Sequence, residues 1–181
     1  MGAWNLFDPI YYNFTRLTYI DTETPAENIL RVRLTRYMGR DVILSDGTQV
    51  NKNDILVKIH LHNVRLLTEI QHLKNDIKRG RFICQSIRKS LPSLVSYIQN
   101  HHKAEEIKGI IGITMLNKGA NRLGFEVVPI SNPFYKWFKW ASFLPINILS
   151  AASPSFKYIS KQSGPNYLFM SKTRLTSMYK G

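Results

Sequence analysis

The clearest pattern in the sequence is a strict alternation of hydrophobic and polar residues over positions 28–37. The hydrophobic members are Leu30, Val32 and Leu34, and the residues between them are Arg31, Arg33 and Thr35. A period of two with β-branched residues predicts a strand that buries one face. This alternation therefore predicts a strand whose other face is basic.

Residues 55–63 alternate in the same way and predict a second long strand. Between the two strands, short apolar segments at 41–44 and 49–50 flank the sequence Ser45-Asp46-Gly47-Thr48. Asp-Gly favours a hairpin turn, because glycine adopts the positive φ that the turn requires. Together these segments predict an antiparallel meander. The last strand presents one face with Ile55, Val57, Ile59 and Leu61. Its other face carries Leu56, Lys58, His60 and His62.

Helical spacing of apolar residues appears at the start and in the middle of the chain. Asp8-Pro9 predicts a helix that begins there and runs to about residue 18. Asn63 is a candidate N-cap for a helix over about 64–78, which Gly80 would end. A further helix would start near Phe82 and be interrupted at Pro92.

The last third of the chain returns to strands. Apolar segments at 107–116, 125–130 and 167–170 predict strands, and Ser171 is placed to cap a short terminal helix. The 181 residues, 44% of them hydrophobic, suit one domain over 1–181 with a substantial core. We therefore predict an α+β fold in which an antiparallel meander packs against several helices.

Charge changes this picture from an ordinary domain to a strongly basic one. Twenty-five Lys and Arg face 12 Asp and Glu, a formal net charge of +13, and no carboxylate follows Glu126. Such a field attracts anionic lipid, a phosphorylated or otherwise anionic ligand, or nucleic acid. The sequence contains no nucleic-acid motif, so nucleic acid is the less favoured of these partners. A solubilising surface without a particular partner is the other interpretation.

The cysteine count and the N-terminal residues point to the cytoplasm. Cys84 is the single cysteine, so an internal disulfide is impossible and a multi-cysteine zinc site is excluded. The N-terminal residues lack a basic segment followed by an apolar one, so they do not predict a secretory signal. No apolar stretch reaches the length of a spanning helix. We expect a cytoplasmic protein that can lie on the inner face of the membrane.

His60 and His62 are the first candidates for chemistry. On a strand both imidazoles would point to the same side, where they could share a metal or one could act as a general base. The nearest carboxylates in the sequence are Asp46, Asp54 and Glu69, and no pattern brings them together. No metal site is therefore predicted, and the sequence leaves the cofactor unknown. A transferase-type enzyme with a histidine base remains an alternative, and whether the protein is an enzyme stays open.

Cations on the predicted outer sheet face form the second candidate site. Guanidinium groups at alternate strand positions present forked donors that suit phosphate or carboxylate. An ordinary solvated strand face is the competing interpretation. The predicted ligand-binding residues are Arg31, Arg33, Lys58, His60, His62 and Asn63.

An aromatic segment that opens at Pro133 is the third candidate. Trp, Tyr and Lys beside an apolar run are typical of a helix that lies in a membrane interface, although a core helix would have a similar composition. Stacking of nucleic-acid bases on these rings is a weaker alternative. The residues predicted to contact the membrane are Lys136, Trp137, Lys139 and Trp140.

Long blocks of the chain carry a family resemblance. They read LRVRLTRYMGRDVILSDGTQVNKNDILVKIHLHN, GITMLNKGANRLGFEV and YLFMSKTRL. These blocks resemble the YkoP-like family of Gram-positive bacteria. Related domains occur fused to polysaccharide-deacetylase-like enzymes, so the resemblance implies a role near cell-envelope polysaccharide metabolism. The aspartate and histidine motifs of those deacetylases are absent here.

Enzyme signatures are otherwise absent. The chain has no phosphate-binding Walker loop, no G-x-G-x-x-G and no G-x-S-x-G. Residues 117–127 look like the late part of a GNAT acyltransferase fold, but the pyrophosphate-binding glycine loop of that fold is missing. Acyl-CoA binding is therefore not predicted.

Overall fold

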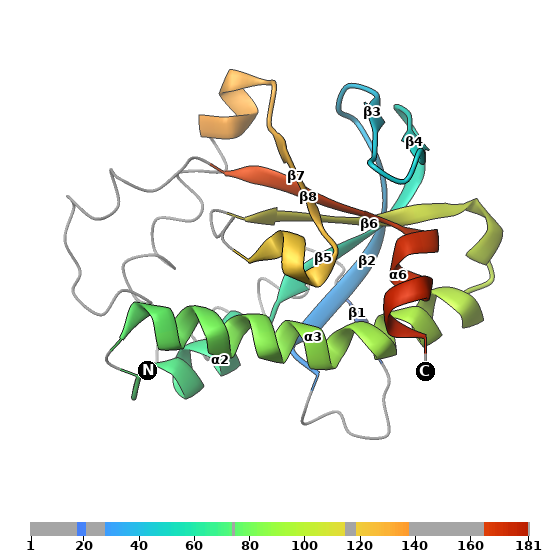
Figure 1. The fold of residues 1–181 in the computed structure, drawn as a ribbon. Helices are drawn as coiled ribbons and strands as arrows, with labels where there is room; N and C mark the ends of the chain where they lie inside the picture. Colours follow the sequence, from blue (N-terminus) through green and yellow to red (C-terminus); the bar gives the residue numbers. More distant parts are fainter. Residues whose placement is uncertain (1–17, 21–27, 74, 115–118, 138–164, 181) are drawn as a thin grey trace.

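A mixed six-stranded sheet forms the centre of the molecule (Figure 1). The computed structural model describes residues 18–20, 28–73, 75–114, 119–137 and 165–180. The strand order is β1-β2-β5-β6-β8-β7, and β5 and β6 are the parallel pair among antiparallel neighbours. The predicted α+β class is confirmed. The strands are β1 (Thr18–Tyr19), β2 (Leu30–Arg36), β5 (Ile55–Leu61), β6 (Ile107–Thr114), β7 (Glu126–Pro129) and β8 (Asn166–Ser171).

The predicted meander takes a different form, because its two long strands are direct neighbours. β2 pairs with β5 from Leu30 opposite Leu61 to Arg36 opposite Ile55. The short strands β3 (Val42–Ile43) and β4 (Gln49–Val50) form a separate two-stranded hairpin. Leu44 and Val50 are buried in one cluster with Leu56 of β5, so the hairpin packs over the sheet instead of extending it. Its turn has the predicted geometry, with Gly47 at φ +81°.

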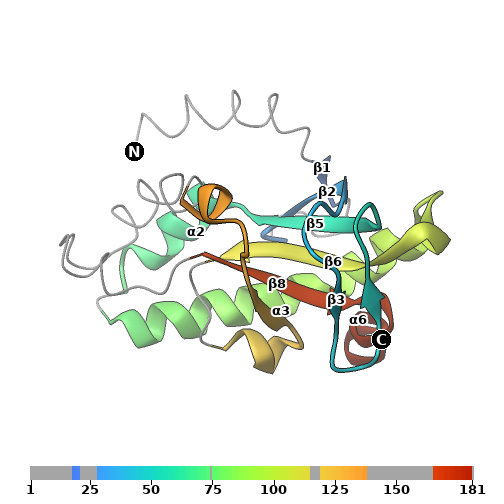
Figure 2. The same ribbon diagram turned by 90° about the horizontal axis from the view of Figure 1, so that it is seen from above.

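Helices cover the opposite side of the sheet. The crossover from β5 to β6 consists of α2 (Asn63–Ile70) and α3 (Asp76–Asn100), and the chain described ends with α6 (Lys172–Tyr179). Two 3-10 helices, η1 (Ala104–Glu106) and η2 (Ala120–Leu123), flank β6. Figure 2 shows α3 running across the strands on their far side. The hairpin lies on the near side.

The helix boundaries differ from the predicted ones. α2 ends at Ile70, and α3 begins at Asp76. Asn75 caps α3, because its side chain accepts a hydrogen bond from the Ile77 amide at 2.8 Å. α3 then continues through Gly80 and Pro92, which the sequence pattern had marked as breaks. Tertiary packing explains the continuity, since Pro92 faces solvent while the helix buries an apolar stripe beside it. That stripe consists of Leu91, Leu94, Val95 and Ile98.

The structure confirms the predicted elements near the end of the chain but differs from the predicted first helix. Ser171 caps α6 as predicted, because its hydroxyl accepts the Arg174 amide at 2.9 Å. Thr18, predicted to end a helix, instead opens β1, and the rest of that predicted helix lies outside the described residues. Predicted strands at 107–116, 125–130 and 167–170 correspond to β6, β7 and β8.

Hydrophobic residues form a cluster on each face of the sheet. The larger cluster joins α3 and α6 to the strands and includes Val32, Val57, Ile110 and Met170. The smaller one lies under the hairpin and includes Tyr37, Leu56, Ile111 and Phe169. Because side chains alternate along a strand, Arg31 and Arg33 share the hairpin side of β2 while Val32 faces α3.

Candidate functional site

Four cationic or ionisable side chains lie together on the hairpin side of β2 and β5. Arg31 is directly opposite His60, and Arg33 is directly opposite Lys58. We call these four residues the basic sheet face. The predicted patch is thus formed by neighbouring strands, with its members at adjacent ladder positions. Arg33 and Lys58 carry like charges at directly opposed positions, an arrangement that disfavours a sheet.

The basic sheet face is more deeply buried than a solvated strand face. The Arg31 side chain is 3% exposed, whereas Arg33, Lys58 and His60 are half-buried. The expectation of an ordinary solvated face is therefore wrong at Arg31. Arg33, Lys58 and His60 each keep part of their surface in solvent, although Arg33 Nε and His60 Nε2 are buried.

His62 and Asn63 do not continue this face. The strand ends at Leu61, and the His62 carbonyl and Nδ1 accept the amides of Leu66 and Arg65 at 3.1 and 3.3 Å. His62 is therefore the N-cap of α2, and the prediction of Asn63 as the cap is wrong. His60 thus lies on the strand, whereas His62 lies beyond its end and caps the helix.

A helix begins at the other candidate segment and exposes aromatic rings. The Asn132 side chain accepts the Tyr135 amide at 3.0 Å, and residues 133–137 are helical, so Asn132 caps a helix opened by Pro133. Phe134 is 85% exposed and Trp137 is 68% exposed, with the exposed Lys136 between them. We call residues 132–137 the aromatic helix start. Lys139 and Trp140 lie outside the described residues.

The aromatic helix start is electrostatically in reach of the basic sheet face. Burial raises the pKa of the Tyr135 phenol, and the Arg33 charge lowers it in part. The Tyr135 ring also stacks on Tyr167 of β8, with ring centroids 6.4 Å apart. Burial, together with Tyr135 and Tyr37, raises the pKa of Tyr167 to about 12. Tyr135 thus anchors the helix start on the sheet, while Phe134 and Trp137 remain outside.

Further exposed apolar residues lie on the hairpin and its approach. Ile43 is 74% exposed and Met38 is 68% exposed. The hairpin and the aromatic helix start project from the same side of the sheet, opposite α3, and lie at opposite ends of that side (Figures 1 and 2). Scattered single exposures are ordinary on protein surfaces. Here, however, exposed apolar residues flank the basic sheet face from two segments.

A polar network that no sequence pattern predicted ties the hairpin to the end of the chain. The Ser45 amide and hydroxyl both donate to the Glu126 carboxylate, and Arg174 donates to the Ser45 hydroxyl at 2.9 Å. The Ser171 hydroxyl donates to Asp46. The partners are 81 to 129 residues apart, so local patterns carry no signal for them. This network fixes the hairpin over the sheet.

The network makes the stability of the fold dependent on pH through Asp46. Partial burial, the strongest single influence, raises the pKa of Asp46. Hydrogen bonds from Ser171 and Thr48 and the Arg174 charge outweigh that influence, so the pKa lies below its ordinary value of 3.8. A carboxyl group with a lowered pKa in the folded state stabilises the fold above its unfolded-state pKa and loses this effect as the pH falls.

We therefore expect the wild-type protein to be more stable than Asp46→Asn near neutral pH, with the difference shrinking below about pH 4. Urea unfolding of both proteins at a series of pH values measures this difference. Comparing the two proteins cancels the titration of the other carboxylates. A difference that stays constant down to acidic pH would show that Asp46 does not act through its charge.

No metal centre or membrane span is found in the described ranges. Within them, no group of three or more His, Cys, Asp or Glu side chains is arranged to hold a metal ion. No helix in the same ranges is both long enough and apolar enough to cross a membrane.

These observations define a basic α+β domain with a mixed sheet, and comparison with known proteins gives its family. The chain belongs to the YkoP domain family, whose model matches residues 1–179. It is 47% identical over 180 residues to the uncharacterized protein YkoP of Bacillus subtilis (strain 168), covering 99% of this chain and 96% of the relative. The relative's description assigns no activity. No solved structure matches the chain significantly.

Proposed function

We propose that this protein is a peripheral membrane-binding protein that docks on anionic lipid through the hairpin side of its sheet. The observation that carries the proposal is the exposure of Phe134 and Trp137 around Lys136, beside the Arg33 end of the basic sheet face. Aromatic rings with a lysine between them suit the boundary between headgroups and acyl chains. The neighbouring cations suit the headgroup phosphates.

Net charge and topology support the same orientation. A formal charge of +13 draws the protein toward an anionic surface before any residue touches it. The helices also expose Ile77 and Met178, but the hairpin side exposes apolar residues on two segments that flank the basic sheet face. The basic sheet face lies on that same side. Docking by this side would place cations and apolar residues against the lipid together.

Domains related to this family occur fused to polysaccharide-deacetylase-like enzymes, and this association extends the proposal to its setting. We place the protein at the cytoplasmic membrane face, as an accessory binding protein in cell-envelope polysaccharide metabolism. In this role the basic sheet face would hold the anionic headgroup of a lipid. This part of the proposal rests on the resemblance, and it needs no catalytic histidine.

The test is co-sedimentation of the protein with vesicles of phosphatidylglycerol or of phosphatidylcholine, at low and at high salt. We expect binding to phosphatidylglycerol that is weakened, but not abolished, by salt. The electrostatic part is screened, whereas aromatic insertion is not. Absence of binding to either lipid under all conditions would rule the proposal out. Shift of an unrelated oligonucleotide without vesicle binding would favour nucleic acid instead.

Neutralising one cation of the basic sheet face should weaken the electrostatic part alone. We expect Arg33→Gln to lower affinity for phosphatidylglycerol vesicles about fivefold at low salt, since each nearby cation contributes about 1 kcal/mol. Lys78→Gln is the matched control, because Lys78 is an exposed cation on α3, on the far side of the sheet. Equal losses in the two variants would mean that net charge, and not this face, directs binding.

A further inference from the structure

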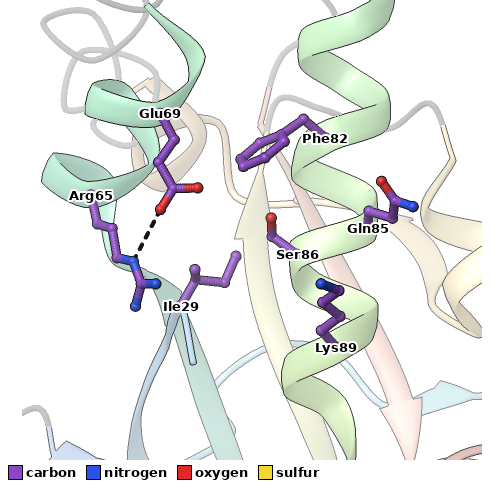
Figure 3. Close-up of a pocket in the computed structure, with 7 residues that line it drawn as sticks. All are labelled: Ile29, Arg65, Glu69, Phe82, Gln85, Ser86 and Lys89. Atoms are coloured by element: carbon purple, nitrogen blue, oxygen red, sulfur yellow. Dashed lines mark hydrogen bonds and ion pairs between the residues drawn. The ribbon is translucent and has the colours of Figure 1, made fainter. Parts of the chain in front are cut away.

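A small cleft separates α2 from the first half of α3, on the side of the sheet opposite the hairpin. Its volume is about 170 Å³, well above the roughly 10–15 Å³ that a single water requires. Figure 3 shows the two helices as its walls, with Ile29 between them. The lining residues are Ile29, Arg65, Glu69, Phe82, Gln85, Ser86 and Lys89.

The floor of the cleft is held in place by hydrogen bonds. Ile29 is 3% exposed, and its amide donates to the Ser90 hydroxyl at 3.1 Å. Its carbonyl accepts the His62 amide at 2.8 Å. Ile29, the residue before β2, is thus hydrogen-bonded both to α3 and to the N-cap residue of α2. A cleft with such a floor is present before any ligand arrives.

The α3 wall of the cleft carries both polar and apolar side chains. Phe82, Gln85, Ser86 and Lys89 recur at the spacing of a single helix face. A helix face turned toward another helix is usually apolar, whereas this one also carries Ser86 and Lys89. Figure 3 shows the Phe82 ring and the Ser86 hydroxyl directed toward α2, while Gln85 points away. Polar and apolar groups therefore both line the opening.

The charges in the cleft leave one cation in excess. Arg65 Nε and Glu69 Oε1 are 3.2 Å apart and form an ion pair along α2. Lys89 takes part in none of the ion pairs found among the described residues. One carboxylate against two cations gives a net charge of about +1, which matches a singly charged anion better than a phosphate dianion.

We infer that this cleft binds a small monocarboxylate with a short apolar stem. Lys89 would receive the carboxylate, with the Ser86 hydroxyl as a further donor, and the stem would lie between Phe82 and Ile29. The volume is below that of sites for drug-sized ligands, so only a short stem fits. This site does not depend on the membrane proposal, because it lies on the other side of the sheet.

The test is a titration of the isotope-labelled full chain with butyrate, followed by amide NMR shifts. We expect saturable shifts at residues 65–69 and 82–89 with a dissociation constant of about 1 mM, within the affinity that so few atoms can supply. Neutral butanol should shift these amides much less. Lys89→Met should weaken butyrate binding at least about tenfold, whereas Lys78→Met on the same helix should leave it unchanged.

Three results would overturn the inference. The first is the absence of saturable shifts at these amides. The second is equal butyrate affinity in Lys89→Met and the wild-type protein. The third is a response to inorganic phosphate at the same amides as strong as the response to butyrate, which would indicate a general anion site. None of these results bears on vesicle binding, so the two proposals fail or succeed separately.

Discussion

Replacing Phe134 and Trp137 together with alanine is expected to lower affinity for phosphatidylglycerol vesicles about a hundredfold. Aromatic side chains bury about 150–250 Å² each, and these two are 85% and 68% exposed. Inserting about 120 Å² of that surface contributes roughly 3 kcal/mol, which corresponds to a hundredfold change in affinity. The loss should remain at high salt, because the contribution is not electrostatic.

The matched control for this prediction is Ile77→Ala. Ile77 is 67% exposed, a fraction similar to that of Trp137. It lies on α3, on the far side of the sheet. Vesicle co-sedimentation of both variants separates a specific docking face from general stickiness of exposed apolar residues. Similar losses in the two variants, or no loss in either, would contradict docking by the hairpin side. Unfolding curves should be nearly unchanged, since these side chains are largely in solvent.

Gly109→Ala is expected to destabilise the fold by about 3 kcal/mol. Gly109 lies in β6 opposite Ser171 of β8, and a Cβ there would overlap the Met170 carbonyl oxygen and lie 3.0 Å from the Ser171 Cα. These are backbone atoms of a central strand pair, so they cannot move aside without disturbing the ladder. Urea unfolding, with the slope checked for two-state behaviour, measures the change.

Gly112→Ala in the same strand is the control for Gly109→Ala. A Cβ at Gly112 would meet side-chain atoms of Ile59 at 3.4 Å and Leu168 at 3.7 Å, which are ordinary contact distances. Neither glycine has a positive φ, so backbone conformation does not distinguish them. We expect Gly112→Ala to stay within about 1 kcal/mol of the wild type. Equal effects at both positions would mean that strand propensity, and not the backbone overlap, decides the result.

The sequence predicted the long strands well because alternation is a local signal. It identified β2 and β5 and the residues of the basic sheet face, and the direct pairing of the strands then brought Arg31 beside His60. It failed where tertiary packing outweighs local preference. The apolar stripe of α3 keeps the helix continuous through Pro92. The predicted cap of α2 is one residue late, since His62 and not Asn63 accepts the amides of Arg65 and Leu66.

The candidate sites show the same division. Exposure of Trp137 agrees with the composition of its segment, but the proximity of Tyr135 to Arg33 depends on the path of the whole chain. The network around Ser45 and the cleft between α2 and α3 join residues that no motif connects. Such sites are created by packing, and their individual residues are unremarkable in sequence.

The position of β8 constrains the order in which this chain can fold during synthesis. β8 is inserted between β6 and β7 in space, although it follows both in the sequence. While the ribosome is still making residues beyond Pro129, β7 has no strand to pair with, and β6 presents an open edge beside β5. Such edges pair readily with other chains. The six-stranded order can be completed only when residues 166–171 emerge. A nascent chain therefore depends on β8 for protection against aggregation.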